Sequence, residues 1–299
     1  MEGIRKIMAC LWFDQEAAKA GEFYLDVFKK SKLLSKSLMT GTPSGDVESL
    51  TLDIEDINLM LISAGPYFKI NPSISFMISC ADQDEARKYW DAFIDGGQAL
   101  MPLDKYDFSE LYGWVEDRFG VSWQIMYVGN EPIKTKIRPA LMFVGDNCGH
   151  AEEAIDYYVD IFGKSELKSV SRYGEGFPPN KPEMLNFAEF ILEGQSFSIM
   201  DSAYDHEFAF TEGVSLIINC DTQEEIDYYW DKLSADPEAE QCGWIKDKYG
   251  VSWQISPTIL NDMMDDKDPA AIERITNAFL KMKKFDLEEL KKAYHGDVD

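Results

Sequence analysis

The apolar residues of this chain fall into short runs of strand length and longer segments with helical spacing, in an order that repeats. The first run, Ile4 to Phe13, is followed by a segment from Gln15 to about Lys30 in which aromatic and aliphatic residues recur at helical spacing. Asp14 stands where a helix N-cap is needed. Three further strand-like runs follow, at 32–39, 48–54 and 57–63. The pattern predicts a βαβββ unit.

The same order begins again after a Gly-Pro turn at positions 65 and 66. The apolar run Ile74 to Cys80 predicts a strand, and Asp82 is placed to cap a helix that carries Trp90 and Phe93. Strands are predicted around 98–101, 111–117 and 121–128. We therefore expect two βαβββ units to make one domain.

The most specific signal in the chain is a phrase that occurs twice, 130 positions apart. The two copies read WVEDRFGVSWQI from Trp114 and WIKDKYGVSWQI from Trp244. Aromatic and β-branched residues flank a turn in which Gly120 or Gly250 is free to adopt a positive φ, so each copy predicts two short strands around a turn. The phrase marks an internal repeat of a whole domain.

The second half of the chain retraces the first. The segment Leu11-Trp12-Phe13 returns as Leu141-Met142-Phe143, and the length differences between the copies are confined to loops. The repeat predicts one domain at 1–130, a second at 135–257, and a tail at 258–299. In that tail Pro269 opens one helix and Asp286 caps another.

Composition and charge narrow the class of protein. A chain of 299 residues with 45% hydrophobic content is long enough to bury a core in each of two domains. The net charge of -25 argues against a nucleic-acid partner, because phosphate binding needs clustered Lys and Arg. No apolar run approaches the roughly 18 residues that span a bilayer, and the N-terminus lacks the features of a signal peptide. We expect a cytoplasmic protein with no membrane partner.

The two hairpins, the Leu11-Trp12-Phe13 strand and the aromatic helices resemble the PhnB-like branch of the vicinal oxygen chelate superfamily. That superfamily includes glyoxalase I, bleomycin-resistance and fosfomycin-resistance proteins, and extradiol dioxygenases. The resemblance covers residues 4 to 257. It implies an α+β fold of tandem glyoxalase-like domains plus C-terminal helices, each domain built from two βαβββ units that form a curved, mostly antiparallel sheet with a ligand on its concave face.

The resemblance also implies where a metal would bind. In metal-using members the ligands come from the first strands of the two units and from a Glu four residues after the final hairpin Gly, a position held here by Gln124 and Gln254. The first-strand segments contain no His, Asp or Glu, although Glu212 precedes one of them. Since a divalent ion needs several converging donors, we expect no metal. Naming in this family sometimes carries a demethylubiquinone methyltransferase label, but no glycine-rich cofactor motif follows a first strand, and we expect no cofactor.

Candidate ligand-binding residues follow from the same resemblance and from strand alternation. Alternation places Ser122 and Gln124 on the concave face, and the repeat places Ser252 and Gln254 likewise. Phe68 and Phe208 lie in matching loops before a strand, where they would rim the cavity together with His206. The simpler alternatives are that each Gln satisfies neighbouring polar groups, that the Trp residues pack in the core, and that His206 is a surface histidine.

Three functions remain open from the sequence. The first is metal-independent binding of a small organic molecule in a concave sheet cavity. The second is a metal-dependent lyase, isomerase or dioxygenase that uses the atypical donors Gln124, Cys10, Glu212 and His206. The third is an interaction role in which the amphipathic tail serves assembly, and this leaves a homodimer open. Whether the protein is an enzyme is not decided by the sequence, because function depends on the site and not on the fold.

Overall fold

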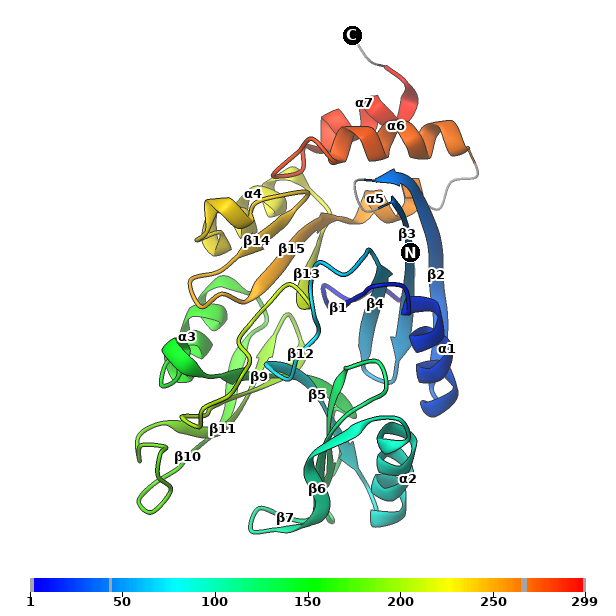
Figure 1. Ribbon diagram of the computed structural model, residues 1–299. Helices are drawn as coiled ribbons and strands as arrows, with labels where there is room; N and C mark the ends of the chain where they lie inside the picture. Colours follow the sequence, from blue (N-terminus) through cyan, green and yellow to red (C-terminus); the bar gives the residue numbers. More distant parts are fainter. Residues whose placement is uncertain (1–2, 43–44, 265–267, 298–299) are drawn as a thin grey trace. The chain divides into compact units, whose positions relative to one another are not determined.

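The computed structural model describes residues 3–42, 45–264 and 268–297 of the chain. The described residues divide into two compact lobes (Figure 1). Lobe 1 combines Met1–Lys69 with Thr211–Asp299, and lobe 2 is Ile70–Phe210. Each lobe is described by itself below.

Lobe 1 is built on a mixed sheet whose described strands run in the order β14-β15-β13-β1-β4-β3-β2. The strands are β1 (Ile7–Phe13), β2 (Ser31–Thr42), β3 (Gly45–Ile54), β4 (Ile57–Ser63), β13 (Val214–Cys220), β14 (Trp244–Lys246) and β15 (Ser252–Pro257). Helix α1 (Ala17–Val27) packs on β2, β3 and β4, and α4 (Gln223–Leu233) packs on β13, β14 and β15. A short 3-10 turn, Pro237–Ala239, precedes β14.

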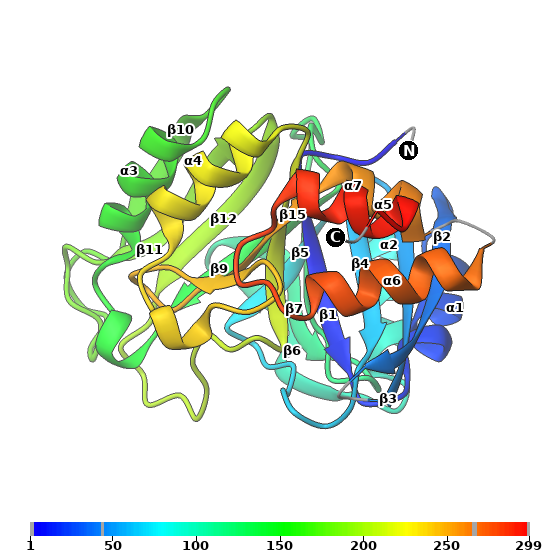
Figure 2. The ribbon, with the colours of Figure 1, turned by 90° about the horizontal axis from the view of Figure 1, so that it is seen from above.

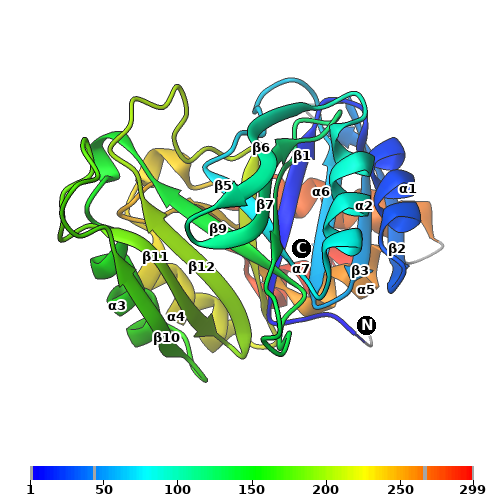
Figure 3. The same ribbon diagram turned by 90° about the horizontal axis from the view of Figure 1, so that it is seen from below.

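Lobe 2 has a sheet in the order β10-β11-β12-β9-β5-β8-β7-β6. Its strands are β5 (Ile74–Cys80), β6 (Gln98–Tyr106), β7 (Ser109–Glu116), β8 (Ser122–Tyr127), β9 (Ile137–Phe143), β10 (Glu166–Arg172), β11 (Leu185–Leu192) and β12 (Gln195–Asp201). Helix α2 (Gln83–Ile94) packs on β5 to β8. Helix α3 (Ala151–Ile161) packs on β10, β11 and β12, which lie side by side in Figure 3.

The predicted fold class is confirmed, but the units pair differently from our expectation. Each lobe combines one unit from each sequence copy, because β1 pairs antiparallel with β13 and β5 pairs antiparallel with β9. Three of the units are βαβββ, and the last, β13-α4-β14-β15, is one strand shorter. We had expected the two units of one copy to share a sheet. All four of these strands are nearly continuous apolar runs, as strands buried on both faces are, so their pattern does not specify which partner each takes. The boundaries near 130 and 257 describe the repeat, and independent folding of each copy stays a prediction.

The repeated hairpin has the predicted conformation in both lobes. Gly120 and Gly250 have φ values of 82° and 81°. The Trp of each Val-Ser-Trp-Gln segment is fully buried, as the packing alternative predicted: Trp123 stacks on Phe93 of α2 with ring centroids 4.7 Å apart. Alternation then turns Gln124 and Gln254 toward the opposite face of each sheet.

Helix ends agree with the sequence only in part. Asp82 accepts a hydrogen bond from the Glu85 amide and caps α2 as predicted. Asp14 does not cap α1, which begins at Ala17, because the Ser63 Oγ from β4 accepts a hydrogen bond from the Ala17 amide instead. The sequence alone could not predict this partner, because Ser63 is 46 positions away from Ala17.

The C-terminal tail forms part of lobe 1. Besides the expected helices α6 (Pro269–Phe279) and α7 (Leu287–His295), capped by Asp268 and Asp286, it contains an unexpected one, α5 (Thr258–Met264), directly after β15. Figure 2 shows α6 and α7 alongside each other, and α6 also packs on β2. Within the described part of the chain, no helix is both long and apolar enough to cross a membrane.

Candidate functional site

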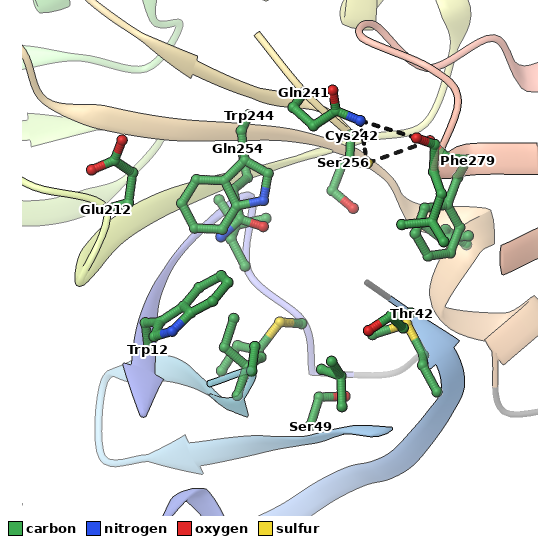
Figure 4. A pocket seen from close by; sticks show the side chains of 18 of the residues that line it. Trp12, Thr42, Ser49, Glu212, Gln241, Cys242, Trp244, Gln254, Ser256 and Phe279 are labelled. Atoms are coloured by element: carbon green, nitrogen blue, oxygen red, sulfur yellow. Dashed lines mark hydrogen bonds between the residues drawn. The ribbon is translucent and has the colours of Figure 1, made fainter. Parts of the chain in front are cut away.

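Lobe 1 contains a cavity of about 610 Å³ between its sheet and its C-terminal tail (Figure 4). On the sheet side, Ile217 forms a buried apolar cluster with Met8 and Cys10, and Met60 and Ile62 pack against this cluster. Met60, Ile62 and Ile217 line the cavity directly. The volume lies in the range of small-molecule sites, which are mostly apolar with a few placed polar groups.

Three aromatic side chains gather at one side of this cavity. The Trp12 ring meets Phe68 edge-on at 4.9 Å and Trp244 edge-on at 6.0 Å between centroids. The indole N–H of Trp12 donates to the Gly65 carbonyl at 2.7 Å, which fixes the ring from the loop side. Phe68 therefore lies at the cavity, in the kind of loop where the sequence placed it.

The polar group at the base of the cavity is the Gln254 amide. Gln254 is half-buried, lines the cavity, and donates from Nε2 to the Ser215 Oγ at 2.9 Å. Cys10 lies beside both: burial raises the pKa of its thiol to about 12, against the opposing effect of hydrogen bonds with Gln254 and Ser215. The thiol is consequently protonated at neutral pH and is a weak nucleophile.

One carboxylate near the aromatic residues is already paired. Glu212, which lines the cavity, forms an ion pair with Lys246 of β14 at 2.8 Å. Figure 4 shows Glu212 on the same side of the cavity as Trp244 and Trp12. A paired carboxylate offers less to a ligand than a lone one, since its charge is compensated.

On the matching face of the lobe 2 sheet, large side chains pack around the hairpin glutamine. Tyr112, Trp114, Met142 and Val144 form a buried cluster, and further apolar side chains pack against it: Leu100, Met101, Tyr106, Met126, Met200 and Phe208. Gln124 is fully buried beneath this cluster. Its Oε1 accepts from the Tyr112 hydroxyl at 2.8 Å and its Nε2 donates to the Ser75 Oγ at 2.7 Å. Both ends of the Gln124 amide are therefore used within the protein.

The difference between the lobes traces to a few positions of the repeat. Tyr112 and Met126, which fill lobe 2, correspond to Cys242 and Ser256 in lobe 1. Cys242 adopts a positive φ of 51°, which bends the chain where β7 continues as a strand through Tyr112. Because Cys242 and Ser256 are smaller than Tyr112 and Met126, they leave space for the cavity in lobe 1.

The two hairpin serines also differ. The Ser122 Oγ accepts from the Trp114 indole N–H at 2.7 Å. Ser252 is equally buried, but its Oγ has no hydrogen-bond partner among the described residues, while Trp244 lies edge-on to Trp12. In lobe 2 the Trp114 indole bonds Ser122, whereas in lobe 1 the matching Trp244 indole lines the cavity.

His206 and Phe208 belong to lobe 2 and not to the cavity of lobe 1. His206 Nε2 lies 2.7 Å from the Ser202 Oγ, and its ring packs on Phe208 with centroids 4.8 Å apart. Burial lowers the pKa of His206, and Asp205 opposes this shift. Of the seven residues predicted from sequence, Gln254 and Phe68 line the cavity.

Sequence reasoning missed the residues that the tail contributes. The cavity is also lined by Leu260, Asn261, Met264, Phe279, Leu280 and Phe285. The available signal was the apolar spacing of the tail together with the absence, in the second copy, of an apolar run matching the strand predicted near 98–101. Arg138 was missed as well: it is buried in lobe 2, where it bonds the Ser79 and Ser198 hydroxyls and pairs with Glu189 at 2.6 Å.

The donors around Gln254 do not suit a divalent metal. The side chains at this position are a neutral amide, a hydroxyl from Ser215 and the single thiol of Cys10. A divalent ion prefers imidazole, carboxylate or thiolate ligands. In the described ranges, no group of three or more His, Cys, Asp or Glu side chains is placed to hold a metal ion.

Comparison with known protein families identifies the repeat. The family described as 3-demethylubiquinone-9 3-methyltransferase matches residues 5–126 and, a second time, residues 135–256. The chain belongs to this family. It carries two family copies in tandem, and the predicted PhnB-like, vicinal oxygen chelate relationship is confirmed.

Two of the solved structures that are similar to this chain cover different shares of it. A putative 3-demethylubiquinone-9 3-methyltransferase, PhnB protein, from Bacillus cereus is 28% identical, with a TM-score of 0.39 over 42% of this chain and 100% of that one. Glyoxalase I from Zea mays is 14% identical, with a TM-score of 0.52 over 83% of this chain and 90% of that one, and it supports the fold alone. The comparison with curated proteins found no match.

Proposed function

We propose that lobe 1 binds a small organic molecule in its cavity without the help of a metal ion, and that lobe 2 is a structural counterpart whose equivalent space is closed. The observation that carries this proposal is the contrast between the lobes. The same hairpin Gln is sealed beneath Tyr112 in lobe 2 and faces an open cavity of about 610 Å³ in lobe 1.

The chemistry of the cavity supports binding of a largely apolar molecule with one hydrogen-bonding group. Aromatic and aliphatic side chains make most of the wall, and burying apolar ligand surface there contributes about 25 cal/mol per Å². Gln254 and Ser256 supply the polar contacts on β15, where an amide and a hydroxyl can each donate and accept. The donor set around Gln254 supports metal-independent binding.

The test is a fluorescence titration with the neutral apolar dye Nile red. The variant Ser256→Met places the lobe 2 side chain, Met126, at the matching position of the cavity and should weaken dye binding about tenfold, a change of about 1.4 kcal/mol. As the matched control, Ser169→Met adds the same side chain on the exposed strand β10 and should leave binding unchanged.

Two results would contradict the proposal. Equal dye affinity in the wild-type protein and in Ser256→Met would remove the cavity as the binding site. Elemental analysis of tag-free protein purified without chelator should show negligible transition metal, and about one equivalent per chain would overturn the metal-independent part.

A further inference from the structure

The second sequence copy lacks a counterpart of the edge strand β6. In lobe 2, β6 pairs with β7 and places Asp104 opposite Tyr112. In lobe 1 the matching segment forms the 3-10 turn at Pro237–Ala239, and β14 has only three residues. The sheet edge beside Cys242 is therefore left without a strand from its own copy.

The C-terminal tail takes this place. The Cys242 amide donates to the Met282 carbonyl at 2.9 Å, and the Gly243 amide donates to the Lys283 carbonyl at 2.7 Å. Gly243 has a φ of 82°, and a Cβ at this position would lie 2.5 Å from the Phe285 ring, so glycine lets the tail approach the sheet closely. The contact is made by backbone, as between neighbouring strands.

Side chains fasten the same segment on its other side. At the start of α4, the side-chain Nε2 of Gln223 donates to the Phe285 carbonyl at 3.1 Å, and its Oε1 accepts from the backbone amide of Leu287 at 2.9 Å. Lys284 forms an ion pair with Asp227 at 2.7 Å. The tail is thus fixed to lobe 1 at several points, and its side chains have defined positions.

The tail residues that face the cavity are almost all apolar. Leu260 and Met264 come from α5, Phe279 and Leu280 from the end of α6, and Phe285 from the segment before α7. In Figure 4, Phe279 lies across the cavity from Trp12 and Glu212. The cavity therefore has an aromatic side near Gln254 and an apolar side formed by the tail.

The charges around the cavity indicate an uncharged ligand. Among the described residues that line it there is no Lys, Arg or His, whereas Glu212 and Glu238 are present. An anionic ligand would meet no Lys, Arg or His in the lining to offset its charge, and a cationic ligand would have to compete with Lys246 for Glu212. A neutral molecule avoids both costs.

We infer that the tail residues Leu260, Met264, Phe279, Leu280 and Phe285 form the specificity-determining wall of the cavity, which selects the length of the apolar end of an elongated, uncharged ligand. The inference rests on the proposed binding function and adds the ligand class and the residues that discriminate among its members. In this arrangement the polar group of the ligand bonds Gln254, and its apolar end extends toward Phe279 and Leu280.

The experiment measures displacement of Nile red from the full-length protein by a homologous series of primary alkanols from hexanol to hexadecanol. With the wild-type protein, affinity should rise about fourfold with each added methylene until the chain meets the tail, and then level off or fall. Leu280→Ala removes part of the wall and should move this optimum toward longer alkanols by about two methylene groups. Leu280→Phe should move it toward shorter ones.

The matched control is Ile272→Ala, which truncates a half-buried residue of α6 that does not line the cavity and should leave the optimum unchanged. If the dye binds, Ser256→Met weakens its binding, and both Leu280 variants keep the wild-type optimum, the tail is not the selective wall and the inference is overturned while the binding function stands. If the dye binding is insensitive to Ser256→Met, the binding function itself has failed.

Discussion

Gln124 and Gln254 hold the same position of the repeated hairpin, yet their amides have different partners. Gln124 is held between Tyr112 and Ser75, whereas Gln254 contacts Ser215 and faces the cavity. The cause lies at one neighbouring position, since the Tyr112 hydroxyl has no counterpart at Cys242. At the residue scale, one side chain outside the repeated motif decides whether the glutamine is structural or available to a ligand.

Alanine at these two positions should separate the two roles. Gln254→Ala should weaken decanol binding about fivefold through loss of one hydrogen bond, with little change in stability. Gln124→Ala should leave decanol binding unchanged but lower the free energy of unfolding by about 2 kcal/mol, because the buried Tyr112 hydroxyl and Ser75 lose a partner. Dye displacement and urea denaturation of both variants measure the four values, and a binding loss in Gln124→Ala alone would reverse the assignment of the lobes.

The sequence could specify part of this residue-scale picture. Strand alternation predicted that both glutamines lie on the face opposite Trp123 and Trp253, and Gln254 lines the cavity. It could not separate the two, because the residues that fill or open each lobe, Tyr112 and Cys242, lie before the repeated phrase begins at Trp114 and Trp244.

At the scale of elements, the hairpin turn is held by an aspartate whose carboxylate accepts three hydrogen bonds. The Asp247 Oδ1 accepts from the amides of Tyr249 and Val251, at 2.9 and 3.0 Å, and its Oδ2 accepts from the Trp253 indole at 2.8 Å. Asp117 makes the same contacts in lobe 2. This explains physically why Asp and Trp occur together in both copies of the phrase: the carboxylate joins the turn to the buried ring.

Asp247→Asn should lower the free energy of unfolding by about 2–3 kcal/mol, because the new amide nitrogen opposes the Trp253 indole N–H as a second donor. Asp117→Asn should cost about the same, since its geometry is equivalent. Asp107→Asn, on the exposed turn between β6 and β7, serves as the control and should stay within about 0.5 kcal/mol of the wild type. Urea denaturation followed by tryptophan fluorescence checks all three, and an unchanged midpoint for Asp247→Asn would show that the carboxylate is not needed.

Prediction of elements succeeded where the signal is local and failed where it is not. The caps at Asp82 and Asp286 depend on residues three positions away, and both were predicted, as was the helix that opens at Pro269. The start of α1 depends on Ser63, and the place of the tail depends on contacts with Gln223 and Cys242, which are distant in sequence. Periodicity carries no information about such contacts.

At the scale of the whole molecule, the sequence repeat and the compact lobes divide the chain differently. The repeat predicted that each lobe is built from two similar units, although the last unit, β13-α4-β14-β15, is one strand shorter than expected. The choice of partner strands could not be predicted, since β1, β5, β9 and β13 are all buried almost throughout. Because each lobe takes one unit from each sequence copy, each lobe depends on both halves of the chain. Strand β1 pairs with β13, and β5 pairs with β9.

This dependence predicts how the chain behaves when it is divided at the joint between the copies. Two fragments, 1–133 and 134–299, should co-purify when they are produced together, because each lobe takes one unit of strands and helix from each fragment. The pairs β1–β13 and β5–β9 lie at the centres of the two sheets, so their loss would expose buried strands on both fragments. Affinity purification through a tag on the first fragment, followed by size-exclusion chromatography, should recover a complex of equal stoichiometry that still binds Nile red. If each fragment instead elutes alone as a folded monomer, the two units of one copy pair with each other, and pairing between the two copies is not required for folding.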